Sequence, residues 1–313
     1  MSFQIVEKSL DGLEVIEIKN RLNGEYVNIV PGHGGVINEV VFNKKGTLHA
    51  IHKCEKSLLE FQEKSVPLYA GAFLAPFPNR IKEGRYQFNE IAHILELNDK
   101  GFDNALHGFL YKAPFSTCHI DKNLGTLSLE THFNGAIGYP FQLYFKNSYH
   151  LKERELIVTS YVRNESGTIV PFGMGWHPYI ATGTSVDLLQ LKTPGKKMFE
   201  QNSQHIPTGK ILENRNFLEK SVISDRFIND CYILENNDQT HIYDAQKDLN
   251  IVIAQQTGEK AYNYCMYYTP PERDCLAVEP MTAAPNAFNN GHGSIILSKG
   301  EEIEIFFSIA LDE

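Results

Sequence analysis

The stretch Glu302-Ile303-Glu304-Ile305-Phe306-Phe307-Ser308-Ile309, close to the end of this 313-residue chain, decides the fold class. Apolar side chains occupy every second position: Ile303, Ile305, Phe307 and Ile309. Successive side chains of a β-strand point to opposite faces, so this alternation predicts a strand with one buried and one exposed face. Residues 127–133 and 156–163 alternate in the same way and predict two further strands.

Helical signals are few by comparison. Residues 51–64 could hold a short helix, and residues 86–97 suggest a hairpin with its turn near Asn89-Glu90. No helix alternates regularly with the strands, which disfavours a parallel α/β sheet. A lipocalin-like barrel is too small for this chain, and a propeller should show an internal repeat. We therefore predict an all-β fold, a large antiparallel β-sandwich forming one domain over residues 1–313.

Charge and composition exclude several classes of function. Lys and Arg total 29 against 38 for Asp and Glu, which gives a formal net charge of -9. A nucleic-acid-binding protein usually carries an excess of positive charge, so this class is disfavoured. No window approaches 18 uninterrupted apolar residues, so no membrane span is expected. The five cysteines form no CxxC pair, and no targeting signal is apparent at the N-terminus. We expect a cytoplasmic protein with reduced thiols and without a cysteine-ligated zinc ion.

Two polar segments contain residue types that could bind a ligand. Asn79 and Arg80 follow two prolines, and the Arg80 guanidinium is a rigid donor suited to oxygen-rich ligands. His107 precedes Gly108, where the chain can turn tightly and leave an imidazole uncovered. Taken alone, the Arg80 segment favours a surface side chain at a loop end, and the His107 segment is a weak signal because most of the 12 histidines are expected to be structural or solvated.

Two further segments could supply an acid and a base. His177 lies between the only Trp of the chain and Pro178, which favours extended backbone. Glu279 follows an apolar run and precedes Pro280, and burial among apolar neighbours should raise its pKa, as suits a proton-transferring group. The alternative interpretations are a core histidine beside a core tryptophan, and an edge-strand glutamate that faces water.

Together these segments resemble the aldose 1-epimerase (mutarotase) family. The most specific likeness is Val278-Glu279-Pro280-Met281-Thr282, followed by Pro285-Asn286-Ala287-Phe288-Asn289. The segment 173–179, Gly-Met-Gly-Trp-His-Pro-Tyr, is similar to a family segment in which Phe usually stands where this chain has Ile180. Asn79-Arg80 and Leu106-His107-Gly108 match in order and spacing, and Asn229-Asp230 matches a segment that carries a sugar-binding Asp.

The resemblance implies a fold, an activity and roles for individual residues. It implies a β-supersandwich with a sugar cleft, in which Glu279 is the general base, His177 the general acid and His107 a second catalytic histidine. Arg80, Asn79 and Asp230 would contact sugar hydroxyls, and neither a metal nor another cofactor is implied. Glu279 would start ionised and His177 protonated, with the two side chains facing each other across one cleft that His107 and Arg80 also line.

Three functions remain open at this point. The first is a mutarotase that interconverts the anomers of a free aldose, with the small-molecule sugar as the only expected partner. The second is a hexose-6-phosphate 1-epimerase, which needs further cations, for which Arg85, Lys112 and Arg273 are available. The third is a non-catalytic sugar-binding protein on the same scaffold, because fold alone does not establish activity. The substrate and the oligomeric state are not determined by these patterns.

Overall fold

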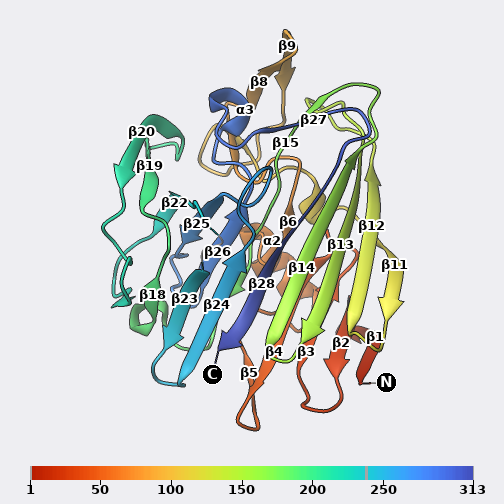
Figure 1. Ribbon diagram of the computed structural model, residues 1–313, viewed down its shortest axis with the longest axis vertical. Helices are drawn as coiled ribbons and strands as arrows, with labels where there is room; N and C mark the ends of the chain where they lie inside the picture. Colours follow the sequence, from red (N-terminus) through yellow and green to blue (C-terminus); the bar gives the residue numbers. More distant parts are fainter. Residues whose placement is uncertain (1, 237–238, 313) are drawn as a thin grey trace.

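The computed structural model describes residues 2–236 and 239–312, and within them strands dominate (Figure 1). The largest sheet has nine strands, and all of its neighbouring strands are antiparallel. In spatial order they are β11 (Ser116–Asp121), β12 (Thr126–Phe133), β13 (Leu143–Lys152), β14 (Glu155–Asn164), β28 (Glu302–Asp312), β24 (Leu249–Gln255), β23 (Gln239–Asp244), β18 (Gln190–Lys192) and β21 (Ser221–Val222).

The three strands predicted from alternation are β28, β12 and β14, and all three belong to this sheet. β14 is adjacent to β28, and β13 separates it from β12. The predicted burial is confirmed for Ile305, Phe307 and Ile309 in β28, whereas Ile303 is half-buried. On the other face Phe306 is 46% exposed, but Ser308, expected at the surface, is buried. The central strands therefore present one apolar face to the interior and one polar face to solvent, as expected for a layered all-β protein.

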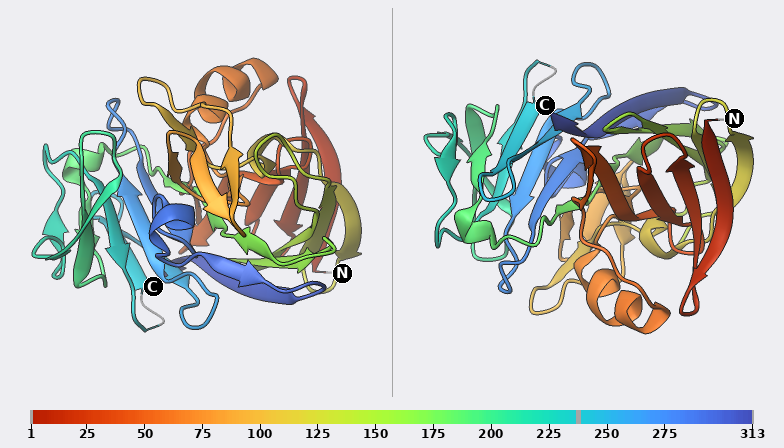
Figure 2. Two further views of the ribbon diagram at one scale, coloured as in Figure 1. Left: turned by 90° about the horizontal axis from the view of Figure 1, so that it is seen from above. Right: turned by 90° about the horizontal axis from the view of Figure 1, so that it is seen from below.

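Two further sheets cover the apolar face of the nine-stranded sheet (Figure 2). The five-stranded sheet is a meander of β1 (Phe3–Leu10), β2 (Leu13–Asn20), β3 (Tyr26–Val30), β4 (Val36–Lys44) and β5 (Thr47–Ala50). The eight-stranded sheet runs β20 (Pro207–Glu213), β19 (Lys197–Gln201), β22 (Asn229–Ile233), β25 (Tyr264–Tyr268), β26 (Leu276–Met281), β16 (Gly175–Trp176) and β6 (Phe73–Leu74), with β17 (Tyr179–Ile180) also paired to β26.

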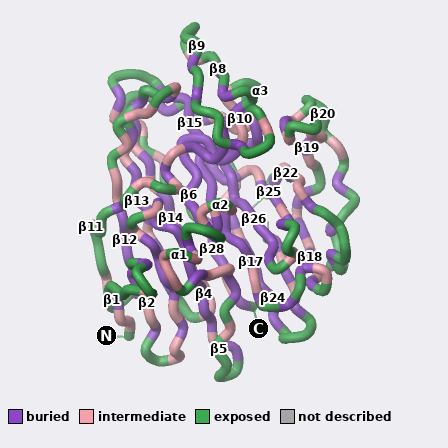
Figure 3. Tube along the Cα trace, turned by 180° about the vertical axis from the view of Figure 1, so that it is seen from behind, coloured by how far each residue is buried: buried purple, intermediate pink, exposed green. Residues whose placement is uncertain are grey.

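One large apolar cluster joins the three sheets. Trp176 is fully buried at its centre, with its ring 5.1 Å from that of Phe73, 6.0 Å from Tyr149 and 5.9 Å from Phe307. The indole nitrogen donates to the Ser160 hydroxyl at 3.0 Å, so its polar atom is satisfied. Figure 3 shows the buried residues through the middle of the molecule and the exposed residues in the loops at either end. The predicted β-sandwich is thus confirmed.

Short elements connect the sheets. The helix expected within residues 51–64 begins later and ends later: Ser57 caps α1 (Leu58–Glu60), and the chain continues through η1 (Phe61–Ser65) into α2 (Val66–Leu68). The predicted hairpin is β8 (Arg85–Phe88) with β9 (Ile91–Ile94), and Asn89 and Glu90 both have positive φ in its turn. The remaining elements are β7 (Arg80–Lys82), β10 (Asn104–Leu106), η2 (Leu110–Lys112), β15 (Val170–Phe172), η3 (Val186–Leu188), α3 (Ala287–Asn290) and β27 (Ile295–Leu297). None of the helices in the described part of the chain has the length and apolar character needed to cross a membrane.

Candidate active site

The register of three strands brings the predicted acid and base together. β16 and β17 both pair antiparallel with β26, with Gly175 opposite Met281 and Tyr179 opposite Ala277. The same register, continued between those pairs, places His177 directly opposite Glu279. Proline has no N–H to donate to a ladder, and each of the two residues is followed by one, so the ladder is interrupted at this point. Because directly opposite residues project from the same face of a sheet, both side chains point into one pocket.

The two side chains are close and almost completely buried. His177 Nε2 lies 3.4 Å from Glu279 Oε1, and the residues are 4% and 2% exposed. His177 Nδ1 and Glu279 Oε2 have no hydrogen-bond partner within residues 2–236 and 239–312. Most buried polar atoms in proteins are paired, so two unpaired atoms on adjacent side chains indicate a place prepared for a ligand.

Backbone contacts hold His177 in position. Its N–H donates to the Ala72 carbonyl at 3.0 Å, and its carbonyl accepts from the Gly71 N–H at 2.9 Å. Gly175 allows the strands to approach, because a Cβ there would lie 2.8 Å from the Pro280 carbonyl oxygen. Trp176 points into the core and His177 to the opposite side, as strand alternation requires, so a core tryptophan and a site histidine occur together.

His107 approaches the same space from a tight turn after β10. Its φ is +63°, unusual for a residue with a side chain, and Gly108 follows with a φ of +67°. The His107 Nδ1 hydrogen-bonds the Pro78 carbonyl at 2.7 Å, and its ring lies edge-on to the rings of His177 and Tyr69, at 5.3 and 4.5 Å. The turn and the Pro78 contact together fix the position of the imidazole in the pocket.

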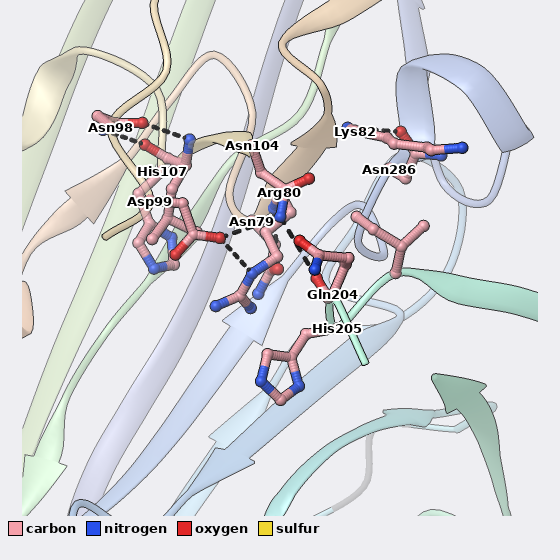
Figure 4. A network of polar contacts seen from close by, with 12 residues as sticks. Asn79, Arg80, Lys82, Asn98, Asp99, Asn104, His107, Gln204, His205 and Asn286 are labelled. Atoms are coloured by element: carbon pink, nitrogen blue, oxygen red, sulfur yellow. Dashed lines mark hydrogen bonds and ion pairs between the residues drawn. The ribbon is translucent and has the colours of Figure 1, made fainter. Parts of the chain in front are cut away.

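Arg80 is oriented by a carboxylate rather than left free (Figure 4). Its Nε donates to Asp99 Oδ2 at 2.8 Å, and the guanidinium lies 5.8 Å from the centre of the Phe102 ring. Asp99 Oδ2 also accepts from the Asn104 amide at 3.1 Å, and that amide reaches the Gln204 carbonyl at 3.3 Å. The chain between β19 and β20 is thereby tied to β10 beside the pocket.

These side chains line one pocket of about 230 Å³. Its polar groups include Asn79, Arg80, His107, His177, Asn229 and Glu279. A second, wider pocket of about 800 Å³ shares Pro67 and Leu68 with it, but there Lys53 is already paired with Asp274 at 2.8 Å. The smaller pocket is the better candidate because it contains the unpaired buried polar atoms.

Burial changes the protonation of the pair. Desolvation raises the pKa of Glu279 to about 8, although the nearby Arg80 charge opposes this, and desolvation lowers the pKa of His177 to about 3. Desolvation, with the neighbouring His177 as a smaller cause, also holds the pKa of His107 well below its usual value. The raised pKa expected for Glu279 has the predicted direction. The same burial opposes the expected charged pair, because desolvation disfavours both charged forms.

Five of the six residues assigned by resemblance line this pocket, and Asp230 does not. In β22 the alternation turns Asn229 toward the pocket and Asp230 to the opposite face, where it pairs across the sheet with Tyr267. Asn229 therefore occupies the place expected for Asp230. The pocket lining also contains eight residues that the sequence patterns did not single out: Pro67, Leu68, Tyr69, Phe102, His205, Phe227, Met266 and Tyr268. Their separation in sequence offers no local signal.

The family model described as aldose 1-epimerase matches residues 14–310. The chain belongs to the aldose 1-epimerase family. Among curated proteins it is similar to the uncharacterized protein YihR of Escherichia coli K12, with 26% identity over 266 residues, which cover 80% of this chain and 82% of that protein.

Solved structures agree with the fold. A galactose mutarotase-like protein from Clostridium acetobutylicum superposes with a TM-score of 0.85 at 20% identity, covering 100% of this chain and 99% of the other. Galactose 1-epimerase from Lactobacillus acidophilus gives a TM-score of 0.81 at 16% identity, covering 99% and 98%. At these identities the likeness supports the aldose 1-epimerase-like β-sandwich and not a particular substrate.

The turn that presents His107 generates a stability prediction. Replacing Gly108 by Ala places a Cβ 2.1 Å from the Ala75 carbonyl oxygen in addition to the positive φ. Gly46→Ala is a matched control, since Gly46 has a φ of +87° and an added Cβ there would meet nothing within 4 Å. In chemical denaturation the free energy of unfolding should fall by roughly 1–2 kcal/mol for Gly46→Ala and by more for Gly108→Ala. Equal losses would mean that the close approach to Ala75 is not needed.

Proposed function

We propose that this protein is a mutarotase, which interconverts the α and β anomers of a free aldose by acid-base catalysis. The observation that carries the proposal is the His177–Glu279 pair, 3.4 Å apart and buried, with unpaired atoms in a small pocket. The volume of about 230 Å³ lies below the roughly 300–1,000 Å³ of pockets for drug-sized ligands, which favours a molecule of monosaccharide size.

Mutarotation requires two linked proton transfers. The C1 hydroxyl loses a proton while the ring oxygen gains one, and the bond between C1 and the ring oxygen breaks to give the open-chain aldehyde. Rotation about the C1–C2 bond exposes the other face of the carbonyl, and the reverse transfers close the ring. One group that accepts a proton and one that donates a proton are sufficient, and each well-placed transfer typically contributes ~10²–10⁴-fold.

The His177–Glu279 pair has one transferable proton in either of two forms. Moving that proton from the carboxyl group to the imidazole converts the neutral pair into an ion pair without changing the total charge. Burial favours the neutral form, while the Arg80 charge favours the carboxylate. The sugar hydroxyls partly replace the lost solvent, so the pair can donate at one sugar oxygen and accept at the other. His107 supplies a neutral imidazole beside them.

Other pocket residues fit a sugar's remaining surface. Phe102, Phe227 and Tyr268 offer apolar faces for the C–H groups of the ring, while Arg80 and Asn229 offer donors for hydroxyls. Arg80 is the one Lys or Arg that lines the pocket within the described residues, and Asp99 already offsets its charge. Arg85, Lys112 and Arg273 lie outside the lining, and Arg273 pairs with Asp187. This distribution favours a neutral sugar over a phosphorylated one.

A panel of freshly dissolved sugars followed by polarimetry tests the proposal. We expect acceleration of mutarotation for at least one neutral aldose, with kcat/KM well above that for the corresponding 6-phosphate, because a dianion would lack a second cation. The spontaneous rate of each sugar is the blank. A large preference for the phosphate would contradict the assigned substrate class. Sugar binding without acceleration would instead support a non-catalytic sugar-binding protein.

Substitution of the pair should abolish catalysis without unfolding the chain. Glu279→Gln and His177→Asn are expected to lower kcat by about 10²–10⁴-fold, since the amides keep shape and polarity but do not exchange the proton. Asp230→Asn makes the same carboxylate-to-amide change on the opposite face of the sheet, and kcat/KM should stay close to that of the parent. If Asp230→Asn removed activity and Glu279→Gln did not, the roles assigned here would be wrong.

The pH dependence of kcat/KM provides a separate prediction. Burial lowers the pKa of His177 to about 3 and raises the pKa of Glu279 to about 8. At a pH between these two values the pair carries one transferable proton. Activity should therefore hold between these values and fall as the pH rises through about 8, when Glu279 loses its proton while His177 is already neutral. In the Arg80→Ala variant this fall in kcat/KM should occur at higher pH, because the Arg80 charge lowers the pKa of Glu279. A fall in kcat/KM near pH 6.5, the usual pKa of histidine, would contradict the assignment of the fall to Glu279.

A further inference from the structure

Three groups in the pocket are of the types that ligate transition metals. His107, His177 and Glu279 each offer one nitrogen or oxygen atom, and these atoms all lie within 4.8 Å of one another. All three side chains are buried, which removes competing water from most of their surface. The set consists of two imidazoles and one carboxylate, which is also found in catalytic zinc sites that leave a fourth position open.

The nitrogen atoms are available in the form that binds a metal. A carbonyl oxygen can only accept, so the His107 Nδ1 that contacts the Pro78 carbonyl at 2.7 Å carries the hydrogen, and Nε2 keeps its lone pair. Metal-ligating histidines commonly donate their other nitrogen to a backbone carbonyl in this way. Glu279 Oε2 has no partner in the described part of the chain, so the carboxylate has unused binding capacity.

The distances are near those that zinc requires. Zinc bonds of about 2.0–2.2 Å in a tetrahedron place two ligand atoms roughly 3.4 Å apart. His177 Nε2 and Glu279 Oε1 are 3.4 Å apart already. The other separations are at most 4.8 Å, so small side-chain movements, totalling no more than about 1.4 Å for any pair of ligand atoms, would complete the geometry. The Arg80 charge opposes a cation in the pocket, but its ion pair with Asp99 at 2.8 Å reduces this repulsion.

We propose that His107, His177 and Glu279 form a binding site for Zn²⁺ or a similar divalent transition metal, and that the bound ion excludes the sugar. The ion would occupy the lone pairs that proton transfer needs, with its fourth position open toward the pocket. The inhibition rests on the proposed mutarotase activity, while the binding of the metal does not. Inhibition of this kind would make the activity depend on the concentration of free zinc.

Calorimetric titration of ZnCl₂ into chelator-treated protein near neutral pH tests the binding. We expect about one tight site for each chain, weakened by at least ~10-fold in His107→Gln and in Glu279→Gln. The control is His132→Gln, which removes an exposed histidine that contacts Glu165 at 2.8 Å and should leave the tight site intact. Absence of a tight site in the parent protein, or its persistence in Glu279→Gln, would overturn the proposal.

A second measurement uses only the unaltered chain, so it does not depend on the folding of variants. Crystals soaked in ZnCl₂ should give an anomalous scattering peak at the zinc edge between His107, His177 and Glu279. Peaks confined to surface histidines would overturn the proposal.

Polarimetry at increasing zinc should show inhibition that excess sugar relieves, because both compete for the same atoms. An unchanged rate of mutarotation at saturating zinc would refute the inhibition but would leave the mutarotase assignment intact. Zinc at the three residues without turnover of any sugar refutes the mutarotase assignment alone.

Discussion

The site depends on one constraint, the register that places His177 opposite Glu279 where neither side chain reaches water. Isolated buried charges are costly, and burial therefore favours a protonated Glu279 carboxyl group beside a neutral His177 imidazole. In the proposed mechanism, this arrangement keeps one mobile proton next to the pocket. A carboxyl group and an imidazole on the surface would instead titrate near their usual values and lose this property.

The surrounding structure prevents the pair from relaxing. His177 is bonded through its backbone to Gly71 and Ala72, and Gly175 allows β16 to pack against Pro280. On the opposite side, His107 is held in a positive-φ turn by the Pro78 carbonyl. Each of these contacts comes from a different part of the chain. The three large sheets act together as a rigid frame, and the frame accounts for the unpaired polar atoms that would otherwise find partners.

The two proposed roles of the pocket, proton transfer and metal binding, draw on the same feature. Both use lone pairs on buried nitrogen and oxygen atoms that are close together and directed at a common space. The electrostatic setting then decides between ligands. Arg80 favours groups with negative or polar oxygen atoms, and Asp99 moderates its charge, so the pocket suits neutral hydroxyls and tolerates a divalent ion. Sugar and metal are therefore expected to exclude one another.

The sequence by itself determined the all-β class and most of the pocket. Period-two alternation, as in β28, is a local property that records which face of a strand is buried. Motif likeness was sufficient to select His177 and Glu279, because each is marked by a neighbouring proline. Tertiary structure alone decided that Asn229 and not Asp230 faces the pocket, that Asp99 orients Arg80, and that burial favours the neutral pair. Strand register and desolvation depend on residues far apart in the chain, so no local pattern contains them.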